Sequence, residues 1–112
     1  MNAEMKKKLA KNWFKILQDM ICRGIEELEG GKKFIVTEWK RNKKNEGGGE
    51  YRVLKEGKIF EKVGVNFSEV YGKFSKEFRN KIPGTNLNPS FWASGISIVM
   101  HTKNPHVPAM HF

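Results

Sequence analysis

The sequence predicts an α+β fold in which an N-terminal amphipathic helix packs on an antiparallel sheet. Two observations support this class. Apolar residues recur every three or four positions between Asn2 and Glu29, and β-branched or aromatic segments separated by glycine and proline turn signals follow. The 112 residues suit one small domain or part of a larger one, and a hydrophobic content of 38% supports a modest core.

The first element expected is a long helix from Asn2 to Glu29. Asn2 is a suitable N-cap, and Gly30-Gly31 would end the helix because glycine adopts the left-handed conformation at little cost. We expect this helix to pack against the sheet rather than bind a membrane or a calmodulin-like partner. The apolar positions that define its face are Leu9, Trp13, Ile16, Leu17, Met20, Ile25 and Leu28.

A strand is predicted next, at Phe34–Trp39, which is β-branched and aromatic. The polar stretch Lys40–Gly49 predicts a flexible loop or edge segment. Its final three glycines resemble a phosphate cradle, but no helix start or P-loop lysine follows them. A phosphate site is therefore not expected there.

The segments Glu50–Leu54 and Lys58–Phe67 flank Lys55-Glu56-Gly57, which predicts a β-hairpin with Gly57 at the positive-φ position of the turn. Glu61 interrupts the apolar face of the second strand. The other members of that face are Ile59, Val63, Val65 and Phe67. The residues Ser68–Gly72 are expected to form one helical turn or more.

The last third of the chain predicts an excursion and then two more strands. Phe74–Ser90 contains Pro-Gly and Asn-Pro turn signals and is expected to be mobile. A strand follows at Ile96–His101, then a turn at Thr102–Pro108 whose prolines block regular pairing. The final strand is expected to begin near Ala109.

Period-two alternation groups the polar residues of this region. Ser97, Val99 and His101 should share one face of their strand, with Ile96, Ile98 and Met100 on the other. His111 follows on the neighbouring strand, opposite in direction to Met110 and Phe112. These polar side chains predict one wall of a functional site. Because the chain stops in a strand-like apolar pattern, we expect a truncated domain.

Composition narrows the classes of function. The net charge of +9 permits a polyanionic small molecule, an acidic membrane surface or nucleic acid as partner. Its two lysine-rich runs, Lys6–Lys8 and Lys40–Lys44, do not interleave with aromatic residues, so nucleic acid is not expected. A single cysteine, Cys22, excludes an internal disulfide and suits the cytoplasm. Neither a transmembrane segment nor a secretory signal peptide is predicted.

Four groups of residues together resemble one family. They are Gly47-Gly48-Gly49-x-x-Arg52-Val53-Leu54, Gly57-x-x-Phe60-Glu61-Lys62-x-Gly64-Val65-Asn66-Phe67-Ser68 followed by Gly72, Phe91-x-Ala93-x-Gly95-x-Ser97, and His101-x-x-Asn104-Pro105-x-x-Pro108-x-x-His111. The chain is similar to the N-terminal portion of oxygen-dependent coproporphyrinogen III oxidase. The FEKxGVNFS and HxxNPxxPxxH strings are specific in combination.

This resemblance implies that residues 1–112 are the N-terminal fragment of a single domain, part of a larger helix-flanked antiparallel sheet. The family acts in haem (porphyrin) biosynthesis. It converts two propionates of coproporphyrinogen III to vinyl groups, with O2 as co-substrate and no required cofactor. The resemblance also implies a homodimer. An Asn-Tyr-Arg segment that contacts substrate follows the position of Phe112 in the family, so the fragment alone is expected to be inactive and to need a complementing C-terminal chain.

The resemblance assigns roles to individual residues. His111 matches a catalytic histidine described as a proton donor, and Ser97 matches a substrate-binding serine. His101 and His111 match metal-ligand positions in some bacterial members, which makes a divalent metal a minor expectation. The stretch Glu46–Lys55 matches a dimer-contacting region, whose candidate residues here are Gly47, Gly48, Gly49, Arg52, Val53 and Leu54.

Each role has a simpler alternative. Ser97 could be a strand hydroxyl bonded to backbone, and two histidines are too few to close a zinc site. His106, inside the proline-bounded turn, is expected to be exposed and structural. Two other functions also remain open: a small basic module that binds a polyanion or nucleic acid, which would show strongly salt-dependent affinity, and a non-catalytic dimerisation remnant, which would dimerise without binding porphyrinogen.

Overall fold

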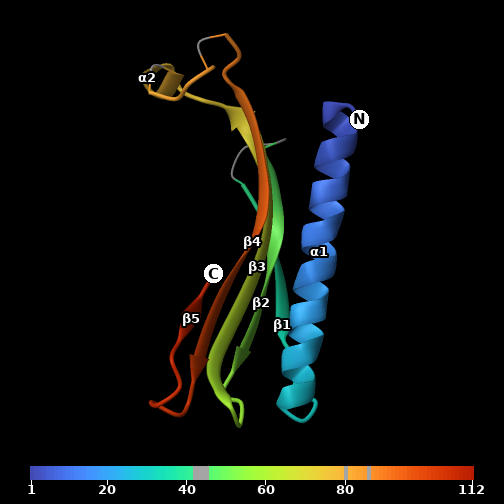
Figure 1. Ribbon diagram of the computed structural model, residues 1–112, viewed down its shortest axis with the longest axis vertical. Coiled ribbons are helices and arrows are strands. Elements are labelled where there is room, and N and C mark those ends of the chain that lie inside the picture. Colours follow the sequence, from blue (N-terminus) through green and yellow to red (C-terminus); the bar gives the residue numbers. More distant parts are fainter. Residues whose placement is uncertain (42–45, 80, 86) are drawn as a thin grey trace.

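The computed structural model describes residues 1–41, 46–79, 81–85 and 87–112. Helix α1 (Ala3–Leu28) lies along one face of a five-stranded antiparallel sheet in which the strands follow one another in sequence order (Figure 1). The strands are β1 (Ile35–Lys40), β2 (Gly47–Lys55), β3 (Phe60–Lys73), β4 (Ser90–Thr102) and β5 (Met110–His111), and a short helix α2 (Lys76–Arg79) stands between β3 and β4. The predicted α+β class is confirmed.

Both ends of α1 form as the sequence predicts. The Asn2 side chain accepts a hydrogen bond of 2.8 Å from the Met5 amide, which satisfies one of the free N–H groups of the first turn. At the other end Gly30 and Gly31 take φ values of 72° and 100°, conformations that glycine adopts without strain.

The face by which α1 contacts the sheet differs from the predicted one. Gln18, Cys22 and Ile25 are its buried residues. Five of the seven predicted positions are exposed: Leu9, Trp13, Ile16, Met20 and Leu28. The reason is helical geometry, since positions 18, 22 and 25 fall about half a turn from positions 9, 13, 16 and 20. The helix therefore carries a second apolar stripe that points away from the sheet.

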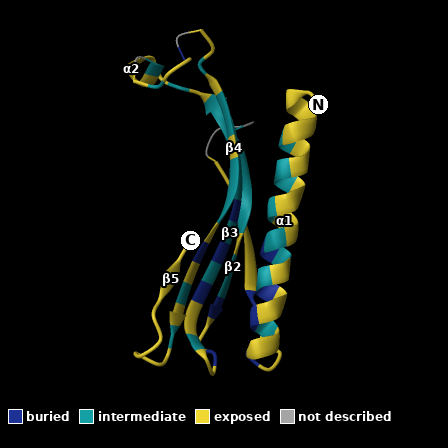
Figure 2. Cartoon of the chain, viewed as in Figure 1, coloured by how far each residue is buried: buried dark blue, intermediate teal, exposed yellow. Residues whose placement is uncertain are grey.

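The core lies between the C-terminal half of α1 and the lower part of the sheet (Figure 2). Val63 and Val65 of β3 are fully buried there, and Gln18 donates hydrogen bonds to the carbonyl oxygens of Glu50 (2.9 Å) and Val65 (3.1 Å). The hydrogen bonds allow a polar side chain to be buried at this position. The buried apolar cluster consists of Cys22, Ile25, Phe34, Leu54, Val63, Val65 and Ile98.

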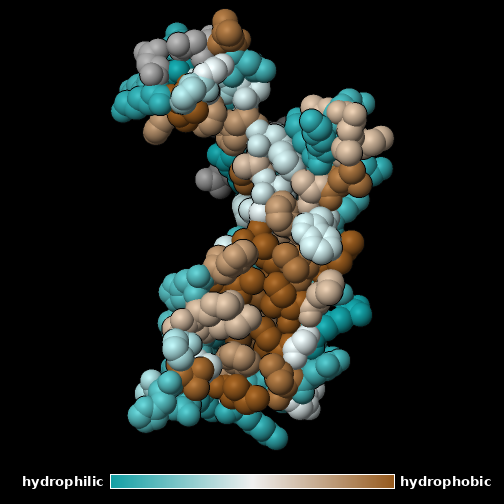
Figure 3. All heavy atoms as spheres, in the orientation of Figure 1, coloured by the Kyte–Doolittle hydropathy of each residue, from teal (hydrophilic) through white to brown (hydrophobic). Residues whose placement is uncertain are grey.

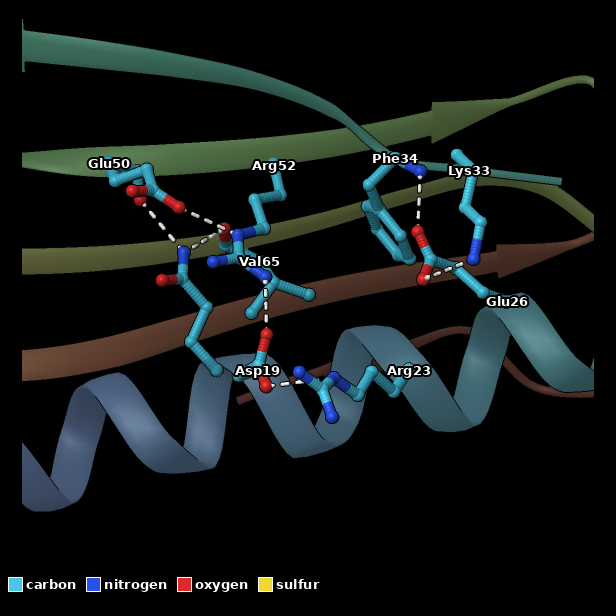
Figure 4. A network of polar contacts seen from close by, with 9 residues as sticks. Asp19, Arg23, Glu26, Lys33, Phe34, Glu50, Arg52 and Val65 are labelled. Carbon is cyan, nitrogen blue, oxygen red and sulfur yellow. Dashed lines mark hydrogen bonds and ion pairs between the residues drawn. The ribbon is translucent and has the colours of Figure 1, made fainter. Parts of the chain in front are cut away.

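Ion pairs join α1 to β2 beside this core. Arg52 contacts Asp19 at 3.2 Å and Glu50 at 2.6 Å, and Asp19 also pairs with Arg23 at 2.9 Å (Figure 4). Nearer the end of the helix, the Glu26 carboxylate accepts a hydrogen bond from the Phe34 amide at 2.9 Å. The helix is thus fixed to the sheet by polar contacts on one side and by the core on the other.

Three local predictions are wrong. Ser68–Gly72 is not helical, because these residues continue β3 in register with β4. The stretch Gly47–Gly49 is the start of β2 rather than loop, while residues 42–45 of the predicted loop lie outside the described residues. In the turn between β2 and β3, Glu56 rather than Gly57 takes the positive φ, 55°. Gly57 is needed for a different reason: a Cβ there would collide with the Glu29 carboxylate.

The break in alternation at Glu61 has a structural cause. The register between β3 and β4 shifts between Phe60 and Lys62, which marks a β-bulge. The extra residue allows Phe60 to pack against the core cluster, as Val63 does, although they are three positions apart. Ile59, placed on the buried face by sequence, precedes β3 and is 42% exposed.

Candidate active site on the open face of the sheet

The sheet face opposite α1, here called the open face, carries the polar residues that the sequence grouped together. Ser97 and His101 lie on it because Ile98 between them is buried against α1. The bounds of β4 are wider than predicted, but the alternation is the predicted one. His111 pairs with Val99, so its side chain emerges on the same face. The structure therefore places Ser97, His101 and His111 on one face of the sheet.

The β4–β5 hairpin positions the two histidines. Two backbone hydrogen bonds join the two arms of the hairpin. Ile98 N donates to Phe112 O (2.7 Å), and Phe112 N donates to Ile98 O (2.8 Å). The turn between the strands is held by Thr102, whose hydroxyl contacts the carbonyl oxygens of Asn104 (3.0 Å) and Val107 (3.2 Å). This arrangement fixes the backbone on both sides of the histidine pair.

His101 and His111 are in direct contact. Their Nε2 atoms are 3.0 Å apart, and the rings stack with centroids 5.3 Å apart. One Nε2 must donate a proton and the other must accept it. The pair can therefore hold a proton between two exposed rings, at a position open to a ligand. His106, as expected, is exposed in the turn, and its amide donates to the Asn104 side chain at 2.9 Å.

Ser97 lies opposite Asn66 of β3 in the sheet register. The Asn66 side-chain oxygen accepts a 3.0 Å hydrogen bond from the indole N–H of Trp39. This contact orients the amide and leaves its NH2 group as a donor beside the Ser97 hydroxyl. Sequence reasoning missed Asn66 and Trp39. The signal was present, since alternation along β3 places Asn66 between the buried Val65 and Phe67.

Ser97, His101 and Asn66 line a hollow of about 350 Å³ on the open face. Side chains of three strands contribute to it, including two that the sequence reasoning did not single out, Tyr51 and Lys62. Gly64 lies at its centre. The open-face residues lining it are Tyr51, Val53, Lys62, Gly64, Asn66, Ser97, Val99 and His101.

A larger hollow of about 700 Å³ lies on the other side of the sheet, between α1 and strands β1 to β3. Two of its basic residues are paired with carboxylates of the same hollow. Lys11 pairs with Glu69 at 2.9 Å, and Arg52 pairs with Glu50 at 2.6 Å. It contains none of the histidines, so the open-face hollow is the better candidate for chemistry.

The predicted dimer-contacting residues have contacts within the chain. Leu54 is 1% exposed in the core, and Arg52 is paired with α1. The glycines at the start of β2 allow Trp39 to approach, because a Cβ on Gly49 would lie 2.7 Å from the indole ring. If this segment contacts a second copy of the chain, as predicted, the contact must be made by its open-face residues, among them Val53.

Only two potential ligands, His101 and His111, are present at the predicted metal site among the described residues. His101 and His111 come together, but the described residues contain no cluster of three or more histidine, cysteine, aspartate or glutamate side chains suited to a metal. Zinc sites take three or four protein ligands. The residues described do not by themselves fit a metal centre.

Sequence comparisons with known proteins identify the family of this chain. The family model for coproporphyrinogen III oxidase matches residues 9–112. The chain belongs to the coproporphyrinogen III oxidase family. It is 49% identical over 115 residues to the oxygen-dependent coproporphyrinogen-III oxidase of Rickettsia felis, covering 95% of this chain and 40% of that protein. The Rickettsia africae enzyme of the same name is 47% identical over 121 residues, covering 100% of this chain and 42% of its own length.

The chain spans about two fifths of the length of these relatives. It corresponds to their N-terminal portion. No helix among the described residues is long and apolar enough to cross a membrane. The family match includes the open-face hollow and both histidines.

Proposed function

We propose that this chain forms the N-terminal part of a haem-biosynthesis enzyme that oxidatively decarboxylates coproporphyrinogen III. Each of two propionates would lose CO2 and two hydrogens to become a vinyl group. One O2 would be reduced to H2O2 for each propionate converted. The observation that carries the proposal is the 3.0 Å histidine pair on the same open sheet face as Ser97, in a chain of this family.

His111 is proposed to transfer the proton. Histidine exchanges protons near neutral pH, and its partner His101 holds the ring through the Nε2 contact. Ser97 is exposed opposite Asn66, and within the described part of the chain its hydroxyl makes no hydrogen bond. It is therefore available to donate to a propionate or pyrrole group of the substrate. The sheet would contribute position and orientation.

We propose no step through a cofactor or metal, because O2 is the oxidant and the described residues provide only two metal ligands. A divalent metal held by His101 and His111 would need further ligands from outside these residues. We propose the cytoplasm as the site of the reaction, in keeping with a single buried free thiol, Cys22.

Partners are proposed on the basis of exposed apolar surface. Apolar side chains gather in the middle of the face between α1 and the strands (Figure 3). The outer stripe of α1, defined here as Leu9, Trp13, Ile16 and Met20, is between 52% and 60% exposed. Contiguous apolar surface of this kind marks an interface. We propose that the chain binds the complementing C-terminal part of the family's sequence and that the completed enzyme is a homodimer.

The test is His111→Ala in the completed enzyme, formed by this chain and the complementing part. We expect turnover at saturating substrate to fall about 10²–10⁴-fold, because a proton-transfer group acts on the barrier. Binding of the substrate should change little. The matched control is His106→Ala, which removes an exposed histidine of the same hairpin and should be nearly neutral. Unchanged turnover in His111→Ala, or an equal loss in both variants, would contradict the proposal.

A further inference from the structure

We infer that Gly64 is the floor of a trough on which an apolar pyrrole ring of the ligand rests, and that Lys62 binds one of its carboxylates. The inference rests on the proposed function and deepens it, since it assigns two recognition residues to the same site. It follows from the order in which the sheet register arranges side chains on the open face.

Three neighbouring rows of side chains on the open face surround the hollow. The middle row is apolar, with Val53, Gly64 and Val99 side by side on β2, β3 and β4. The row on one side is neutral and polar: Tyr51, Asn66 and Ser97. The row on the other side is basic: Lys55, Lys62 and His101.

Gly64 makes the middle row a trough. A Cβ built on Gly64 would meet no atom within 4 Å, whereas its neighbours Val53 and Val99 carry side chains. Its backbone φ is not positive, so the chain conformation does not require glycine. Glycine inside a strand costs about 0.5–1 kcal/mol and often marks close approach of a ligand or another backbone. The open space above Gly64 admits a flat ring.

Lys62 supplies positive charge at one rim of the trough. It lies directly opposite His101 in the register and lines the hollow. Within the described residues Lys62 forms no ion pair, in contrast to Lys11, which is bound to Glu69. Its ammonium group is therefore free to bind a carboxylate.

The opposite rim supplies neutral donors. Trp39 holds the Asn66 amide so that its NH2 group remains a donor, and the Ser97 hydroxyl lies across from it. An apolar floor between a basic rim and a neutral polar rim fits a ligand with apolar rings and carboxylates at its edge. A porphyrinogen with four carboxylates has this chemistry.

The experiment measures binding of coproporphyrin III, the stable oxidised form of the proposed substrate, by fluorescence titration of the completed enzyme formed by this chain and the complementing C-terminal part. Gly64→Val should raise Kd at least about tenfold by filling the trough. Valine is a good strand residue, so the Tm should not fall. Lys62→Met should raise Kd about fivefold, the scale of an exposed ion pair, and should leave Kd for the tetramethyl ester unchanged.

Two matched controls use the same substitutions elsewhere. Gly95→Val changes another open-face glycine whose Cβ would meet nothing within 4 Å, outside the hollow. Lys73→Met removes the same charge at the far end of β3. Both should leave Kd unchanged.

Equal effects in the variants and their controls, or an unchanged Kd in Gly64→Val, would overturn the inference. Neither result bears on the His111 test in the completed enzyme, so failure of this inference and failure of the proposed function are distinguishable. A Lys62→Met effect on the ester as large as on the acid would also overturn the role of Lys62.

Discussion

Single side chains in this chain hold elements together as well as line the site. Glu29 caps the C-terminal end of α1 and is 4% exposed. Its carboxylate accepts hydrogen bonds from the amides of Lys58, Ile59 (2.9 Å) and Phe60 (2.8 Å), at the turn before β3. Burial would raise the pKa of Glu29, but these three donors and the nearby charge of Lys32 outweigh it and hold the pKa below its usual value.

This lowered pKa predicts a pH-dependent stability. A carboxylate whose pKa is lower in the folded state stabilises the fold above its unfolded pKa, here 4.5, and loses that contribution as the pH falls through the folded pKa. Glu29→Gln should therefore lower the Tm at neutral pH and flatten the loss of stability below pH 4.5. Thermal unfolding measured against pH checks this, with the exposed Glu27→Gln as control. Identical pH profiles for wild type and Glu29→Gln would contradict it.

Period-two alternation in the strands predicted which faces are buried, whereas helical spacing in α1 did not. The faces of β4 follow directly from period-two spacing, so Ser97, His101 and His111 could be placed together from the sequence. Helical spacing identified α1 but not its buried face, because two apolar stripes run along it and only the sheet determines which one is buried. Lys62 directly precedes the buried Val63, so alternation places it on the open face, but only the register shows that it lies opposite His101.

The outer stripe of α1 predicts that this helix binds the complementing C-terminal part. Ile16 is 52% exposed on that stripe, whereas Ile25, nine positions later on the same helix, is 5% exposed in the core. Ile16→Lys should leave the Tm unchanged and weaken binding to the complementing C-terminal part. Ile25→Lys should lower the free energy of unfolding by more than about 3 kcal/mol, because it buries an unpaired charge. Calorimetric titration and thermal unfolding separate the two effects. Wild-type affinity in Ile16→Lys would contradict the interface.

The whole molecule is elongated, with extents of 51 × 28 × 26 Å, and its two faces differ in role. The face under α1 contains the core, and the open face contains the histidine pair and the hollow. The ends of β3 and β4 with α2 extend beyond the body (Figure 1). One wall of a site on an open sheet face needs a second wall to exclude water and hold the substrate. The sequence indicated the first wall, while the second cannot be derived from these residues.

We propose that this chain supplies one wall of the site and that catalysis requires the other. The most direct measurement is oxygen uptake and product fluorescence with anaerobically prepared coproporphyrinogen III, for the chain alone and with increasing amounts of the complementing C-terminal part. We predict no conversion by the chain alone and a rate that rises until the two parts are equimolar. Sustained conversion by the chain alone, above the rate of spontaneous oxidation, would contradict the account, as would no conversion by two parts shown to bind each other.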